Sequence, residues 1–136
     1  MIWTAAGTEC EMRHNRDQIK LGRDAAHRRA LFRNLLSSLF EHGSIITTDA
    51  KAREVKRRAD RLIAMAREDT LHHRRIAASE LFGAAAVQAL FGQWGRSFQN
   101  RSGGFTRSVK IGQRQGDGAP LTLVEIIGAR EEKSPE

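Results

Sequence analysis

Apolar residues between positions 31 and 40 repeat with the period of an α-helix. Leu31, Leu35 and Leu39 recur every fourth residue, and the neighbouring row is apolar at 32, 36 and 40. Such a wide stripe is typical of a helix that packs against a core. Asp24 suits the N-cap of this helix, and Gly43 suits a left-handed C-terminal cap. The pattern therefore predicts a first helix between these two caps.

Three further helices and a short strand are predicted before Gly95. The β-branched run at 44–48 predicts the strand, and Thr47 or Thr48 then caps a helix that runs to about Arg67. Its predicted buried face consists of Val55, Ala59, Leu62, Ile63 and Ala66. Thr70 is expected to cap a short helix with Leu71, Ile76 and Leu81 on its packing face. Gly83 is expected to end this third helix, and the apolar pattern of residues 84–94 predicts a fourth helix.

The pattern changes to strands after Gly95. A polar loop at 96–104 precedes an alternating segment at 105–111, which predicts a strand with one wet face. Its apolar face is expected to carry Phe105, Val109 and Ile111, and its wet face Thr106, Ser108 and Lys110. Glycines at 112–118 predict a hairpin turn. The nearly continuous apolar run at 121–127 is typical of a central strand.

The order of these elements predicts an α+β fold, α-β-α-α-α-β-β. We expect a two-layer domain, with a small three-stranded sheet and helices packed on one face. A length of 136 residues suits one domain. We assign this domain to residues 12–127, of which residues 12–23 form a basic arm. Residues 1–11 are expected to be a disordered N-terminal extension and residues 128–136 a disordered charged tail.

The charge balance points to a polyanionic partner. The chain has 23 Lys and Arg against 16 Asp and Glu, a formal net charge of +7. The cations that could reach phosphates fall into the arm, the first helix and the late loop and hairpin. They are Arg13, Arg16, Lys20, Arg23, Arg28, Arg29, Arg33, Arg96, Arg101, Arg107, Lys110 and Arg114. The charges of the second helix alternate in sign, which is typical of a solvated surface.

Other classes of function lack support in the sequence. No nucleophile with a matching base is visible, so we do not expect an enzyme or a small-molecule substrate. Cys10 is the one cysteine, and His72 and His73 are adjacent rather than three or four residues apart, so neither a metal nor a cofactor is expected. No stretch has the length of a membrane-spanning helix, and the first eleven residues do not resemble a secretory signal.

RNA is favoured over DNA as the polyanion. A helix-turn-helix would place two helices around a short turn, whereas a strand is predicted between the first two helices here. A basic arm with glycine-rich loops better fits folded RNA that is recognised by shape, backbone and 2′-hydroxyls.

An ordered set of motifs resembles one known family, bacterial ribosomal protein seventeen of the large subunit. The motifs in the first half are M-R-H at 12–14, L-G-R at 21–23, H-R-x-A-L at 27–31, R-N-L at 33–35, S-L-F-E-H at 38–42, I-x-T-T at 45–48 and A-K-A at 50–52. They continue with A-D-x-L-I at 59–63, G-G-F-T-R at 103–107 and G-D-x-A-P at 116–120. The similarity covers roughly 12–127.

The resemblance implies a cytoplasmic, non-catalytic structural protein of the large ribosomal subunit. It would bind large-subunit ribosomal RNA beside neighbouring ribosomal proteins near the exit of the nascent-chain tunnel, without a cofactor. The RNA contacts that it implies are Arg13, His14, Lys20, Arg23, His27, Arg28, Arg33, Arg101, Gly103, Gly104, Arg107 and Arg114. The family arm is usually denser in basic residues. Here Asn15, Asp17, Gln18 and Ile19 interrupt it, so either a weaker grip on RNA or a different path of the arm is expected.

Two alternatives follow from the residues themselves. A free-standing nucleic-acid-binding regulator could use the same basic surface, and an enzyme acting on RNA would need Glu41, His42 or Asp117 in a pocket. The aromatic side chains Phe82, Trp94 and Phe98 could contact a neighbouring protein or fill the core, with the core favoured for Trp94.

Overall fold

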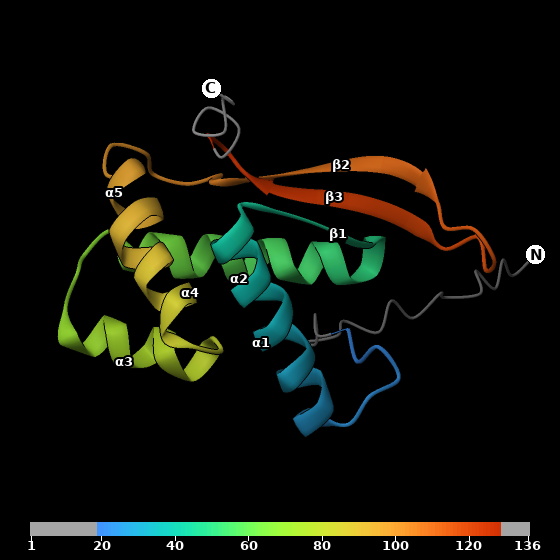
Figure 1. Cartoon of the computed structure of the whole chain (residues 1–136), viewed down its shortest axis with the longest axis horizontal. Helices are drawn as coiled ribbons and strands as arrows, with labels where there is room; N and C mark the ends of the chain where they lie inside the picture. The colour runs from blue at the N-terminus through green and yellow to red at the C-terminus, as the bar shows by residue number, and fades with distance from the viewer. Residues whose placement is uncertain (1–18, 129–136) are drawn as a thin grey trace, which may run out of the picture.

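The computed structural model describes residues 19–128, in which all helices lie on one side of a three-stranded sheet (Figure 1). The elements are α1 (Ala25–His42), β1 (Ser44–Thr48), α2 (Asp49–Ala66), α3 (Leu71–Glu80), α4 (Ala84–Ala89), η1 (Leu90–Trp94), α5 (Gly95–Ser97), β2 (Thr106–Gln113) and β3 (Pro120–Ile126). This confirms the predicted α+β class and the order of elements. Because η1 is a π-helical turn that joins α4 to α5, the fourth predicted helix continues to Ser97.

Both predicted caps of α1 are present. The side chain of Asp24 accepts a hydrogen bond from the backbone N–H of His27 at 3.2 Å, which satisfies one free amide of the first turn. Gly43 has a φ of 78°, and its N–H donates to the carbonyl oxygen of Leu39 at 2.7 Å. Only glycine adopts this left-handed conformation at little cost, so the end of α1 follows from the sequence.

The sheet is antiparallel with the order β1-β3-β2. The central position of β3 confirms the prediction from its apolar run. Ile45 of β1 and Ser108 of β2 both pair with Val124 of β3, and a bulge separates Lys110 from Gly112 on β2. Val124 and Ile126 are buried in the core between the sheet and the helices.

Two hydroxyl groups of the sheet donate hydrogen bonds to aspartates of α2. Thr106 Oγ1 donates to Asp60 Oδ1 at 2.8 Å, and Thr122 Oγ1 donates to Asp49 Oδ1 at 3.2 Å. Since Thr106 and Thr122 are buried, these bonds satisfy polar groups that would otherwise be costly to enclose. They also fix which face of the sheet meets α2.

The predicted faces of β2 were therefore wrong. Thr106, expected on the wet face, is buried against α2, whereas Val109 and Ile111 remain 45% and 53% exposed. Phe105 is buried as predicted, but it precedes the strand. Ser108 and Lys110 are exposed as predicted, but every other residue of β2 after Thr106 is exposed as well, so the helices cover only the first residue of this strand.

The packing face of α3 was also predicted incorrectly in part. Leu81, just beyond the helix, is buried, but Leu71 and Ile76 are exposed and Ala77 is the buried residue of α3. Figure 1 shows α3 at the periphery, away from the sheet, so one side of it remains in solvent. None of the helices among residues 19–128 is long and apolar enough to span a bilayer.

Candidate RNA-binding surface

A tight turn leads into α1. Residues 21 and 22 are both left-handed, with φ of 55° for Leu21 and 63° for Gly22, and the N–H of Arg23 donates to the carbonyl oxygen of Lys20 at 3.2 Å. Leu21 is the only residue other than glycine with a positive φ between 19 and 128. Because a left-handed conformation is unfavourable for leucine, the surrounding structure must hold it, and Leu21 packs against the core.

Arg28 ties this turn to the helix. Its Nη1 donates to the carbonyl oxygen of Arg23 at 3.0 Å and lies 3.5 Å from that of Lys20. Arg23 in turn donates from Nη1 to the carbonyl oxygen of Leu21 at 3.0 Å. Arg23 and Arg28, predicted as RNA contacts, therefore also hold the backbone at the start of α1.

We call Lys20, Arg23, Arg28 and Arg29 the α1 cation cluster. Lys20 and Arg29 are exposed, and their side chains make no hydrogen bond or ion pair with any residue from 19 to 128. Asp24 is the one acidic residue in the sequence between 19 and 33, and its carboxylate caps α1. The stretch from 19 to 33 thus supplies the four cations of the cluster against one carboxylate. The predicted contact His27 is also exposed in this region.

One turn after Arg29, Arg33 makes contacts inside the protein. Its Nη2 donates to the carbonyl oxygen of Leu81 at 2.9 Å, and its Cζ lies 4.1 Å from the centre of the Phe82 ring. Phe82 remains 41% exposed. The sequence placed Phe82 among possible protein contacts or core residues, and no motif revealed its pairing with Arg33, 49 positions earlier in the chain.

Two of the three hairpin cations, Arg107 and Arg114, have carboxylate partners. Arg107 Nε donates to Glu125 Oε1 at 2.6 Å, and Arg114 Nε donates to Asp117 Oδ1 at 3.0 Å. The hydrogen bond from Arg114 holds the pKa of Asp117 well below its usual range, and the same bond raises the pKa of Arg114. Lys110 is exposed, and no contact of its side chain is present within 19–128. Of the three hairpin cations, Lys110 is the one left available.

The glycine-rich loop lies apart from the hairpin turn. Arg101 Nε donates to the carbonyl oxygen of Gly103 at 3.1 Å, and Gly104 has a left-handed φ of 64°. Figure 1 shows this loop, between α5 and β2, at the opposite end of the sheet from the turn between β2 and β3. The predicted loop and hairpin cations therefore do not form one continuous patch.

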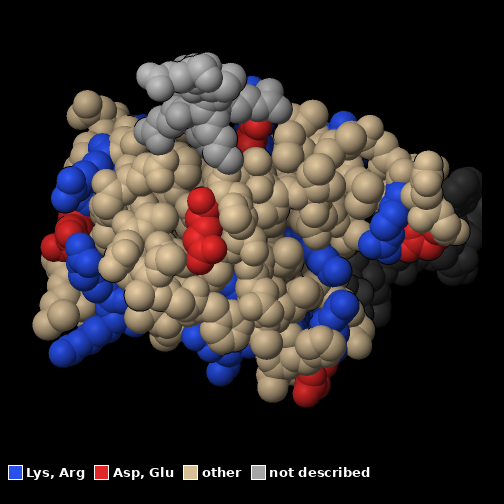
Figure 2. Space-filling view, in the orientation of Figure 1, with Lys and Arg blue, Asp and Glu red and all other residues tan. Residues whose placement is uncertain are grey.

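Half of the cations of the second helix are in ion pairs with carboxylates of the same helix. Arg53 binds Asp49 at 2.6 Å, and Arg58 binds Glu54 at 2.8 Å. Arg61 is exposed without a contact in the described part of the chain. These pairs support the interpretation of α2 as a solvated surface. On the face seen in Figure 2, lysine and arginine lie mainly near the margins, while the middle is largely uncharged.

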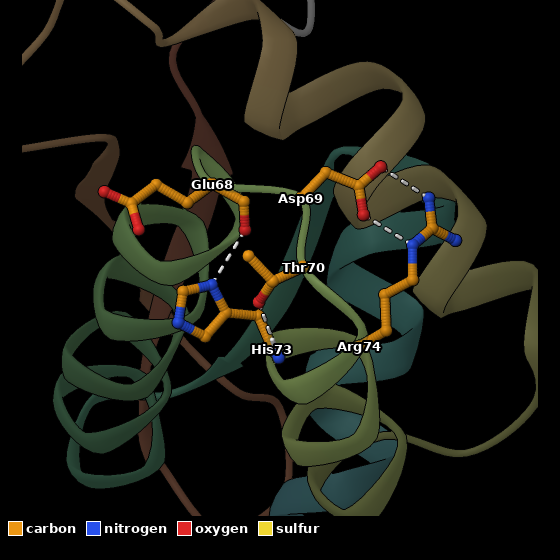
Figure 3. A network of polar contacts seen from close by, with 5 residues as sticks. All are labelled: Glu68, Asp69, Thr70, His73 and Arg74. Carbon is orange, nitrogen blue, oxygen red and sulfur yellow. Dashed lines mark hydrogen bonds and ion pairs between the residues drawn. The ribbon is translucent and has the colours of Figure 1, made fainter.

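The adjacent histidines His72 and His73 lie in the first turn of α3, and Figure 3 shows the contacts of His73. Thr70 Oγ1 accepts from the N–H of His73 at 3.2 Å, and His73 Nδ1 lies 2.7 Å from the carbonyl oxygen of Glu68. Arg74 binds Asp69 through Nε at 2.5 Å, and this bond lowers the pKa of the Asp69 carboxyl group. The carbonyl oxygen of Glu68 can only accept, so His73 Nδ1 is the donor in this bond. Thr70 and His73 therefore serve to cap the start of α3. Within 19–128, no three potential ligands gather around a metal site.

Three predicted contacts, Arg13, His14 and Arg16, lie outside the described residues, as do the 1–11 extension and all but the first residue of the 128–136 tail. The predicted contacts that the structure does bring together are Lys20, Arg23 and Arg28, and Arg29 is the next residue on α1. Arg33 follows on the same helix. The loop and the hairpin are separate from them.

Comparisons with known proteins identify one family. The family model described as ribosomal protein L17 matches residues 31–127. The large ribosomal subunit protein bL17 of Carboxydothermus hydrogenoformans is 48% identical over 79% of this chain and 96% of its own length. That of Desulforapulum autotrophicum is 45% identical over 85% of this chain and 97% of its own. That of Desulfosudis oleivorans is also 45% identical, over 88% of this chain, which spans 58% of that longer relative.

Proposed function

The chain belongs to the ribosomal protein L17 family, and on that premise we propose that it is a structural constituent of the large ribosomal subunit that binds ribosomal RNA. The family is not enzymatic, in agreement with the absence of catalytic motifs in the sequence. We therefore expect the protein to act by binding RNA through one or more of its basic surfaces.

The α1 cation cluster is the observation that carries the proposal. Hydrogen bonds to backbone carbonyls hold Arg28 beside the Lys20–Arg23 turn, so positive groups are kept together although they repel one another. Phosphate groups would relieve that repulsion, and release of their counterions would favour binding. Arginine is suited to this role because its planar fork can bind phosphate through two hydrogen bonds.

The remaining predicted contacts extend the proposed surface. The arm residues Arg13, His14 and Arg16 precede the cluster in the sequence and would continue it along the RNA. Lys110 and the loop of Arg101, Gly103 and Gly104 would bind elsewhere on a large RNA, because they lie away from α1. We assign Arg107 and Arg114 a smaller part, since carboxylates already neutralise much of their charge. Neighbouring large-subunit proteins near the tunnel exit are the proposed protein partners.

Charge reversal tests the cluster without disturbing the turn. Lys20→Glu with Arg29→Glu alters two exposed side chains, whereas reversal of Arg23 or Arg28 would also break hydrogen bonds that shape the backbone. Arg61→Glu on α2 is the control, because Arg61 is also exposed and its side chain makes no hydrogen bond or ion pair within 19–128. A tagged chain is expressed in bacteria, and its sedimentation with the large subunit is measured on sucrose gradients.

The wild-type chain and Arg61→Glu are expected to sediment with the large subunit at about one copy per particle, and the double variant to remain near the top of the gradient. Binding of purified protein to large-subunit ribosomal RNA should fall roughly a thousandfold between 50 and 200 mM salt if about six phosphates are contacted. Salt-independent binding, or normal assembly of the double variant, would contradict the proposed surface.

A further inference from the structure

We propose that Phe82 is a stacking platform for an unpaired base of the bound RNA, with Arg33 supporting the ring and Arg29, one helical turn before Arg33, binding a phosphate. The proposal rests on the function proposed above and names one of its contact sites. Phe82 lies in the linker of residues 81–83, between α3 and α4. Neither the predicted contacts nor the family motifs include it.

Phe82 is held in place without being part of the core. Its backbone N–H donates to Ser37 Oγ at 2.7 Å, and Ser37 Oγ donates to the carbonyl oxygen of Arg33 at 2.8 Å. The preceding Leu81 is buried and accepts from Arg33 Nη2 at 2.9 Å. The linker is therefore anchored to α1 through its backbone and through Leu81. The Phe82 ring itself stays 41% exposed, so its position is fixed while much of its surface meets solvent.

The guanidinium of Arg33 covers one side of this ring, at 4.1 Å from Cζ to the ring centre. A cation at this distance is attracted to the negative face of the ring, which holds the ring in one orientation. Stacking of a base requires a flat, rigid aromatic surface, and side chains of this kind bind the splayed bases of single-stranded RNA. The arrangement thus supplies a pre-oriented π surface above a positive charge.

The charges around Phe82 favour RNA over an apolar protein surface as the occupant. Arg29 precedes Arg33 by one helical turn, so the two side chains lie on the same row of α1. Arg29 is exposed and has no partner between 19 and 128. A nucleotide presents a π face for Phe82 together with a phosphate for Arg29. An apolar protein side chain would use the ring but leave the cation without a partner.

Substitutions of Phe82 test the stack in the full-length protein, with protein-free, refolded bacterial large-subunit ribosomal RNA as the probe. Phe82→Leu keeps an apolar side chain but removes the π face, and Phe82→Trp enlarges it. Leu71→Ala on α3 is the control, since Leu71 is an exposed apolar residue outside the linker. Far-UV circular dichroism and urea unfolding of each variant establish that the fold is kept.

Phe82→Leu is expected to weaken RNA binding roughly 5- to 100-fold, the range for loss of one stacked base, without changing the salt dependence. Phe82→Trp and Leu71→Ala should bind like the wild type. With Trp3→Phe in both proteins, addition of RNA should also quench tryptophan fluorescence more in Phe82→Trp than in the wild type, because the other tryptophan, Trp94, is buried.

Three outcomes would overturn the stack. Normal RNA binding by Phe82→Leu would refute it while leaving the proposed function intact. If Phe82→Leu bound RNA normally but failed to join the large subunit, Phe82 would contact a protein and not an RNA base. Absence of salt-dependent RNA binding by the wild type would refute both proposals together.

Discussion

The indole Nε1 of Trp94 donates a hydrogen bond of 2.9 Å to the backbone carbonyl oxygen of Phe40. Phe40 lies in the last turn of α1, where carbonyl groups have no partner within the helix. Trp94 belongs to the π-helical turn η1, so this bond joins two segments 54 residues apart. It satisfies a buried acceptor and a buried donor at once.

We expect Trp94→Phe to lower the free energy of unfolding by about 1–3 kcal/mol, because it leaves the carbonyl group of Phe40 buried without a donor. The substitution keeps an aromatic ring, so most of the apolar packing is retained. Urea unfolding followed by far-UV circular dichroism measures the change. A loss below about 0.5 kcal/mol would indicate that water or a shifted backbone replaces the bond.

Gly95 allows the helix after η1 to approach α2. A Cβ atom on Gly95 would lie 2.5 Å from the carbonyl oxygen of Ala66, which is backbone and cannot easily move. We therefore expect Gly95→Ala to destabilise the fold by about 1–3 kcal/mol through overpacking. Gly92→Ala is the matched control three residues earlier, since its Cβ would meet open space and alanine favours a helix. Equal stabilities for the two variants would disprove the close contact.

Removal of the Arg28 side chain should loosen the turn before α1. Arg28→Ala is expected to speed cleavage by trypsin after Lys20 and Arg23 roughly tenfold, which corresponds to loss of about 1.4 kcal/mol of hydrogen bonding. Arg29→Ala removes a neighbouring arginine that makes no contact among residues 19–128, and it should leave the cleavage rates unchanged. Mass spectrometry of the first peptides released gives both rates. Equal rates would mean that Arg28 does not hold the turn.

The hairpin turn should keep its ion pair at acidic pH. Because Arg114 lowers the pKa of Asp117, the pair contributes stability above the ordinary aspartate pKa of about 3.9, and that contribution is lost as pH falls through the lowered value. An NMR titration of the Asp117 carboxyl carbon should have its midpoint below that of ordinary aspartates. Arg114→Gln should return the midpoint to the ordinary range. An ordinary midpoint in the wild type would show that the pair does not persist in solution.

Much of the fold could be predicted because its boundaries depend on local chemistry. Asp24 and Thr70 cap helices through their own side chains, and Gly43 ends α1 through a conformation that glycine adopts readily. The apolar run of β3 indicated a strand covered by neighbours on both edges, and β3 is central. These features need only residues that are close in sequence.

The binding surface was harder to predict, since composition does not reveal which cations are already paired. Arg107 and Glu125 are distant in the sequence and meet only because β2 pairs with β3. Arg28 was predicted as a phosphate contact from its charge, yet it also holds a turn through carbonyl groups that a motif does not display. Phe82 gained its interest only from its contact with Arg33 of α1, 49 positions earlier in the chain.

The sequence by itself determined the class of the fold, both ends of α1 and the family, because each depends on periodicity, capping residues or ordered motifs along the chain. The tertiary structure decided which face of β2 is buried, which arginines bind carboxylates, and which aromatic ring stays exposed above a cation. The physical reason is that burial and pairing of charges depend on groups brought together from distant positions. Net charge indicates a polyanionic partner, but the surface offered to that partner consists of the cations that folding leaves unpaired.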